Sequence, residues 1–209
     1  MTDAERDAER ERHEAERAAM REVLDRDEAT PLRVLVLAER LPVADVTGFR
    51  MVSALANRAT ELRVTVGAAA AAADDVRTLE AKGVEVIVGA DPSWIAERPM
   101  HATVVIVLGA AAALRYGGFV LDRQPQAALV YDPSGPAPDD HLAGRAAEAP
   151  LLSVADVVLA PVRGYDAFVR TIAPRATVVA SAPGTPDLDR SLAHVLATCG
   201  VALPDAAFA

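Results

Sequence analysis

Short apolar runs alternate with helical patterns from residue 32 to the end of the chain. The apolar runs are rich in Val, Leu and Ile and lack a strict polar alternation, as expected for strands that helices cover on both faces. The predicted strands span residues 33–38, 62–66, 84–88, 103–108, 127–131, 156–160 and 177–180. This order predicts an α/β fold, a doubly wound Rossmann-like and mostly parallel sheet of about seven strands.

Helical patterns fill the connections between these runs. The predicted helices span residues 49–58, 71–81, 93–97, 110–121, 140–153, 164–172 and 187–198. Gly83 follows the second of these helices, where a left-handed cap is expected. Right-handed crossovers in a doubly wound sheet then place a ligand crevice at the carboxyl ends of the first and fourth strands.

The first 30 residues differ from the rest in composition. Glu, Asp and Arg dominate them, with spacings such as Glu14/Arg17 and Glu22/Arg26 that pair along one helix. No sustained apolar seam supports a coiled coil. We therefore expect a charged, solvated N-terminal helix over residues 1–30, a Rossmann-like domain over 31–187, and a C-terminal helix and tail over 188–209.

Charge and composition exclude several classes of function. The formal net charge is −9, Lys82 is the sole lysine, and aromatic residues make up 4% of the chain, which together disfavour a nucleic-acid partner. No apolar run reaches the length of a membrane span and no signal peptide is recognisable, so we expect a cytoplasmic protein without a transmembrane segment. The single cysteine, Cys199, forms no intrachain disulfide and is expected to be a buried structural thiol.

Familiar phosphate-binding motifs are missing from the sequence. It contains neither Gly-x-Gly-x-x-Gly nor Gly-x-x-x-x-Gly-Lys-Ser/Thr, which disfavours a nicotinamide or flavin cofactor and a P-loop enzyme. Instead, a loop over residues 39–48 follows the first strand and ends at Gly48, just before a predicted helix. A glycine there permits a close backbone approach to a phosphate at the helix N-terminus, with Arg50 as a charged contact.

Several blocks, in order, resemble a known family. They are Leu41, Pro42, Asp45, Gly48, Arg50 and Met51; the Leu-Glu-Ala-x-Gly-Val-Glu-Val run at residues 79–86, followed by Trp94; Ala113, Leu114, Arg115 and Tyr116; Val130, Tyr131 and Asp132; residues 155–158; and Pro183, Gly184 and Asp187. Together they resemble the N-terminal, acceptor-side domain of family-4 glycosyltransferases, which have the GT-B architecture of two Rossmann-like domains around a cleft.

The resemblance implies roles for particular residues. Asp132, with His141 a few residues further on, takes the catalytic positions near an acceptor, whereas Asp45, Gly48 and Arg50 take the positions near the donor phosphate. In this family the second domain binds the nucleotide-diphosphate sugar, and no cofactor or metal is obligatory. Since nothing after Asp187 supplies that domain, we expect a protein partner or a homo-oligomer through the domain-facing surface.

Alternative interpretations stay open for these residues. Gly48 is also compatible with an ordinary turn, Arg50 with a solvated first-turn residue, Asp132 with a cap, and His141 with an exposed or helix-capping residue. The family often has a second acid and a histidine where this chain has Gly135 and Ala137. The chain is therefore either one half of a sugar-transfer enzyme or a non-catalytic, glycosyltransferase-derived module that binds another protein.

Overall fold

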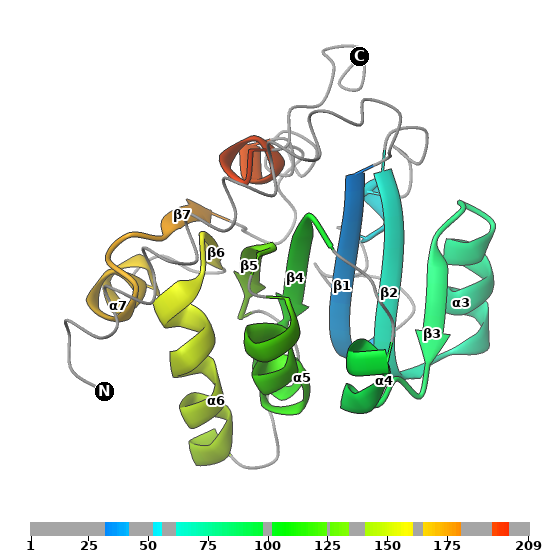
Figure 1. Ribbon diagram of the computed structural model, residues 1–209, viewed down its shortest axis with the longest axis horizontal. Helices are drawn as coiled ribbons and strands as arrows, with labels where there is room; N and C mark the ends of the chain where they lie inside the picture. The colour runs from blue at the N-terminus through cyan, green and yellow to red at the C-terminus, as the bar shows by residue number, and fades with distance from the viewer. Residues whose placement is uncertain are drawn as a thin grey trace.

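One parallel sheet of seven strands organises the protein (Figure 1). The computed structural model describes residues 32–41, 52–55, 62–97, 102–124, 126–133, 141–160, 165–180 and 194–200. The strands are β1 (Leu32–Leu41), β2 (Leu62–Ala71), β3 (Glu85–Val88), β4 (Val104–Leu108), β5 (Ala128–Asp132), β6 (Val157–Ala160) and β7 (Thr177–Ala180). Their spatial order is β3-β2-β1-β4-β5-β6-β7, so the chain winds outward from β1 in one direction and then in the other. The predicted doubly wound α/β fold is confirmed.

The helices lie between consecutive strands, as parallel pairing requires. They are α3 (Ala73–Glu80), α4 (Pro92–Glu97), α5 (Gly109–Arg123), α6 (His141–Val154) and α7 (Tyr165–Ile172). Two shorter helical stretches are described at residues 52–55 and 194–198. Figure 1 shows α4, α5 and α6 on the side of the sheet that faces the viewer. None of the helices in the described ranges has the length and apolarity that crossing a bilayer requires.

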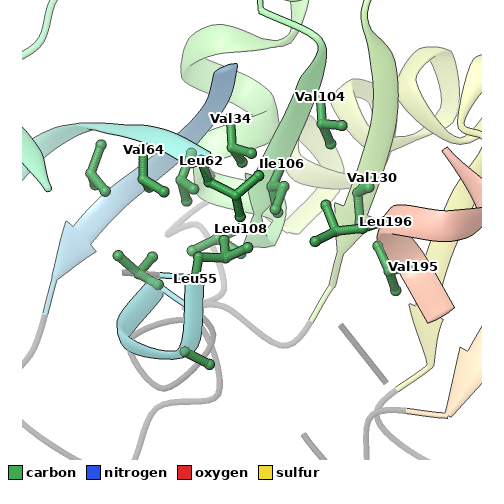
Figure 2. Close-up of a cluster of buried hydrophobic side chains, with 14 of the residues drawn as sticks. Val34, Leu55, Leu62, Val64, Val104, Ile106, Leu108, Val130, Val195 and Leu196 are labelled. Carbon is green, nitrogen blue, oxygen red and sulfur yellow. The ribbon is translucent and has the colours of Figure 1, made fainter. Parts of the chain in front are cut away.

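Successive strand side chains divide the core into two faces. The first face carries Val34 and Val36 of β1, and the second face carries Leu35 and Leu37. Figure 2 shows how the first face is covered: Leu55 comes from residues 52–55, and Val195 and Leu196 come from residues 194–198. Both faces of the central strands β4 and β5 are buried, which explains why these strands lack polar alternation.

The second face is covered mainly by α5 and α6. Tyr116 of α5 and Leu151 of α6 are fully buried in this cluster, together with Leu35 and Val107 of the sheet. The two helices approach closely because Gly117 lies between them: a Cβ atom at that position would come within 3.2 Å of Leu151 Cδ1. The absence of a side chain at Gly117 thus sets the spacing of the helices on this face.

Two strands continue well beyond their predicted ends. The first strand was expected to end at Ala38, but β1 continues to Leu41, so Glu39 belongs to the strand and not to the following loop. The second was expected to end at Val66, but β2 continues through Gly67 and the alanines to Ala71, and α3 therefore begins at Ala73. The alanine run favours a helix by propensity, and pairing with β1 overrides that preference.

Other predictions fall partly outside the described residues. The charged helix over residues 1–30 and the tail after residue 200 lie outside them, as do residues 42–51, which include Asp45, Gly48 and Arg50. The helix predicted over 49–58 is described at 52–55, and the helix predicted over 187–198 is described at 194–198. Cys199 is 2% exposed, which confirms the prediction of a buried thiol.

Adjacent glycines in α5 offer a matched test of this packing. Gly118 is exposed and a Cβ atom there meets nothing within 4 Å, whereas a Cβ atom at Gly117 meets Leu151. We expect Gly117→Val to lower the free energy of unfolding by about 1–3 kcal/mol through overpacking. Gly118→Val should stay within about 0.5 kcal/mol of wild type, since valine and glycine differ little in an exposed helix. Urea denaturation of both variants measures the difference, and equal effects would contradict the packing argument.

Candidate functional site

The candidate site lies at the sheet edge formed by the carboxyl ends of the strands. β1 pairs with β2 on one side and with β4 on the other, so the strand order reverses between β1 and β4. Ligands of open α/β sheets bind in the crevice outside this switch point. Within the described residues, the edge is formed by the last residues of β1, by Leu108 and Gly109, by Asp132, and by the residues that follow β2 and β3.

Asp132 is the last residue of β5 and pairs in register with Leu108 of β4. It is 1% exposed. Ala128 and Val130, which precede it by four and two residues, belong to the core of the first face, so the strand alternation directs Asp132 to the same side. Asp132 therefore lies at this edge with its carboxylate buried and not on an open surface.

Tyr131, its neighbour in β5, points to the opposite face. Its hydroxyl donates a hydrogen bond of 2.6 Å to Glu148 Oε1 of α6, and both residues are buried. This contact ties α6 to the strand that carries Asp132. The prediction from sequence did not include it, because a tyrosine and a glutamate 17 residues apart show no pattern along the chain.

An ion pair joins β1 to α5 at the switch point. Arg115 Nε lies 2.6 Å from Glu39 Oε2, and Arg115 Nη2 lies 3.1 Å from Glu39 Oε1. The hydrogen bonds that Arg115 donates to Glu39 raise the pKa of Arg115. Arg115 was noted in the sequence only as part of a family-like block, and Glu39 was placed in a loop. The sequence therefore did not predict this ion pair, because the pair depends on the strand register that brings Glu39 and Arg115 together.

Asp91 adds a further carboxylate near Arg115. It precedes α4, where its Oδ1 accepts a hydrogen bond of 2.8 Å from the backbone N–H of Ser93. That hydrogen bond is the main cause of the lowered pKa of Asp91, and the positive charge of Arg115 contributes to it. Asp91 therefore caps the start of α4, and the carboxylates of Glu39 and Asp91 both act electrostatically on the Arg115 guanidinium.

Tyr116 anchors α5 in the core of the second face. It is fully buried, and its hydroxyl donates a hydrogen bond of 3.0 Å to the carbonyl oxygen of Ala90, just after β3. Burial is the main cause that raises the pKa of Tyr116 to about 12. The bond holds α5, and with it Arg115, against the segment that carries Asp91.

A second buried carboxyl, Asp75, lies in the first turn of α3 after β2. It is 1% exposed, and its Oδ2 has no hydrogen-bond partner. Leu79, one helical turn further on, packs in the core of the first face, so Asp75 faces the sheet on that side. Burial, and then the neighbouring charge of Asp74, raise the pKa of Asp75. Sequence reasoning missed this residue because Asp74 and Asp75 look alike in the chain.

The remaining predicted site residues are not brought together in the described structure. Asp45, Gly48 and Arg50 lie outside the described residues, as do Gly135 and Ala137. His141 is the first residue of α6 and lies within the helix predicted over residues 140–153, but its side chain is not among the described ones. Among the described residues, no group of three or more His, Cys, Asp or Glu side chains is arranged to hold a metal ion.

Comparison with known proteins adds little to this geometry. No family model and no curated protein matches the chain. A solved structure named MT0777 is 14% identical with a TM-score of 0.42, over 80% of this chain and 97% of that one. A pyrophosphate-dependent myo-inositol-1 kinase converted into a myo-inositol-3 kinase is also 14% identical with a TM-score of 0.42, over 75% of this chain and 74% of that one. These values are too low to bear on function, and the Rossmann-like class rests on the sheet itself.

The raised pKa of Asp75 predicts a stabilising substitution. A carboxyl whose pKa is raised in the folded state stabilises the fold fully only at pH values below its ordinary pKa of 3.8. This contribution is lost as the pH rises through the folded-state pKa. Asp75→Asn should therefore raise the free energy of unfolding by about 1 kcal/mol at pH 7, with a smaller gain near pH 4. The control is Asp74→Asn, because Asp74 is exposed and pairs with Arg77. Loss of stability in Asp75→Asn, measured by urea denaturation, would contradict the assignment.

The buried hydroxyl of Tyr116 predicts a dependence on alkaline pH. At pH 7, Tyr116→Phe should lower the free energy of unfolding by about 1 kcal/mol, because the Ala90 carbonyl loses its donor. The folded-state pKa of about 12 lies above the ordinary value of 10.0, so this contribution is complete below pH 10 and is lost as the pH rises to 12. Urea titrations between pH 7 and 12 should show the wild type losing its advantage over the variant. A constant difference over that range would refute the role of Tyr116.

Proposed function

We propose that the protein is the acceptor-side half of a GT-B-like glycosyltransferase, and that a partner chain supplies the nucleotide-sugar-binding domain. The observation that supports this proposal most directly is the position of Asp132 at the carboxyl end of β5, in register with Leu108 beside the switch point. β1 ends at Leu41 at the same edge, because the carboxyl ends of parallel strands lie together. On this proposal, Asp45, Gly48 and Arg50, which follow β1 in the sequence, take the donor-phosphate positions that the family resemblance implies.

The proposed reaction is displacement at the anomeric carbon of a donor sugar. The Asp132 carboxylate accepts the proton of an acceptor hydroxyl, and the hydroxyl oxygen forms the new bond to the anomeric carbon. The bond from that carbon to the donor phosphate breaks, and the nucleoside diphosphate leaves with the electron pair. Gly48 and Arg50 then bind the leaving phosphate, with no cofactor bound by this chain itself. His141, at the start of α6, is a second candidate near the acceptor.

The burial of Asp132 favours a second candidate function. A carboxylate that is 1% exposed does not meet an acceptor unless the residues around it move, and Gly135 and Ala137 stand where the family has polar residues. The alternative is therefore a non-catalytic, glycosyltransferase-derived module that binds another protein through the domain-facing surface. On this alternative, Asp132 only stabilises the end of β5.

Partner capture followed by activity measurement separates the two functions. The tagged full chain is used to isolate a partner, and sugar transfer from nucleotide-sugar donors is measured with and without that partner. The first proposal expects a partner with a nucleotide-sugar-binding domain and transfer only in the mixture. Asp132→Asn should lower that transfer at least about 100-fold without weakening partner binding.

Asp122→Asn is the matched control, because it removes one carboxylate from the exposed end of α5, away from the crevice. It should leave both transfer and partner binding unchanged. A partner without a nucleotide-sugar domain, bound equally by wild type and Asp132→Asn, would support the interaction module instead. Transfer by the isolated chain would overturn both proposals.

A further inference from the structure

The ion pair between Glu39 and Arg115 has the geometry of a bound anion. Two hydrogen bonds, of 2.6 and 3.1 Å, run from one guanidinium edge to the two oxygens of one carboxylate. Arginine uses the same planar, two-pronged arrangement to bind a phosphate or carboxylate of a ligand. Here the anion belongs to the chain itself, from a residue 76 positions away in sequence.

The strand register places this pair at the ligand edge of the sheet. Ala38 of β1 pairs with Leu108 of β4, so Glu39, the next residue, is level with Gly109, where α5 begins. Glu39 follows Leu35 and Leu37 with the strand period, which directs it to the second face, where α5 lies. Arg115 extends back toward the start of its own helix, as helical side chains do, and meets Glu39 at that level.

The ion pair between Glu39 and Arg115 contributes little to the stability of the fold. The side chains of Arg115 and Glu39 are 40% and 32% exposed, and exposed ion pairs contribute little to stability because solvent screens them. The neighbouring bond from Tyr116 to the Ala90 carbonyl already fixes α5 at this point. Breaking the ion pair would therefore leave α5 attached at this point.

We propose that Arg115 is an anion receptor in the crevice and that Glu39 occupies it as a built-in competitor until a phosphate-bearing ligand displaces the Glu39 carboxylate. A phosphate group is the expected ligand because it offers more negative charge than a carboxylate and matches the guanidinium fork equally well. Asp91 also acts on Arg115 electrostatically, and its negative charge, like that of Glu39, opposes a second anion there. This proposal stands whether or not the protein takes part in sugar transfer.

The test compares two variants that each release one arginine of α5. Glu39→Gln frees Arg115 at the crevice, and Asp122→Asn frees Arg123 at the far end of the same helix, where Arg123 Nε lies 2.8 Å from Asp122 Oδ2. Both substitutions remove one negative charge, so any general effect of charge on anion binding is the same. The net charge of −9 opposes nonspecific anion binding in both proteins.

The probe is inorganic pyrophosphate, titrated into the full chain at constant ionic strength and followed through the arginine Nε–H signals in nuclear magnetic resonance spectra. We expect Glu39→Gln to bind pyrophosphate about three- to tenfold more tightly than wild type, since an exposed carboxylate competes only weakly. The signal of Arg115 should shift on binding. Asp122→Asn should match wild type, and the double variant Glu39→Gln with Arg115→Gln should lose the gain.

Three results would overturn the proposal. They are an equal gain in Glu39→Gln and Asp122→Asn, a gain that survives in the double variant, or no pyrophosphate binding by any of the proteins. Arg115→Lys provides a check on geometry, because it keeps the charge but lacks the planar fork. It should bind pyrophosphate more weakly than wild type. If Glu39→Gln does not fold, Glu39→Ala, which also removes the negative charge, replaces it with the same expectation.

Discussion

Backbone pairing of β1 with two neighbours is the constraint on which the structure depends. β1 shares ladders with β2 and with β4, and all three strands run in the same direction. Since parallel strands need crossover connections, the helices must cover the sheet on both faces. The same pairing makes β1 and β4 the point where the strand order reverses, and it brings the chain segments that follow them to one edge. Every candidate site residue in the described structure owes its position to this arrangement.

The two sides of that edge differ in their electrostatics. On the side of the first face, two carboxyls, Asp75 and Asp132, are buried, and burial opposes the ionisation of Asp75. On the side of the second face, Arg115 is paired with Glu39 and lies near Asp91. Hydrogen-bond acceptors therefore dominate the first side, and the cation of the second side is neutralised by the protein itself.

The fold was largely predictable because it follows from periodicity. Runs rich in Val, Leu and Ile predicted seven strands, and the structure contains all seven in one sheet. The errors occurred where local preference and pairing disagree: the alanines at residues 68–71 favour a helix in isolation, yet they extend β2 because β1 offers them partners. Strand ends in general depend on how far the neighbouring strand continues, and that information is not local.

The candidate site was only partly predictable, for a related physical reason. An acid after a buried strand, such as Asp132, can be placed at the sheet edge from the sequence alone, since the strand pattern itself points there. That Asp132 is buried, that Asp75 faces the core while Asp74 faces solvent, and that Glu39 meets Arg115 were decided by the tertiary structure. The sequence by itself determined the α/β class and the edge at which function is expected, because apolar spacing acts along the chain. Burial and ion pairing depend on contacts between distant residues, so only the folded arrangement decided them.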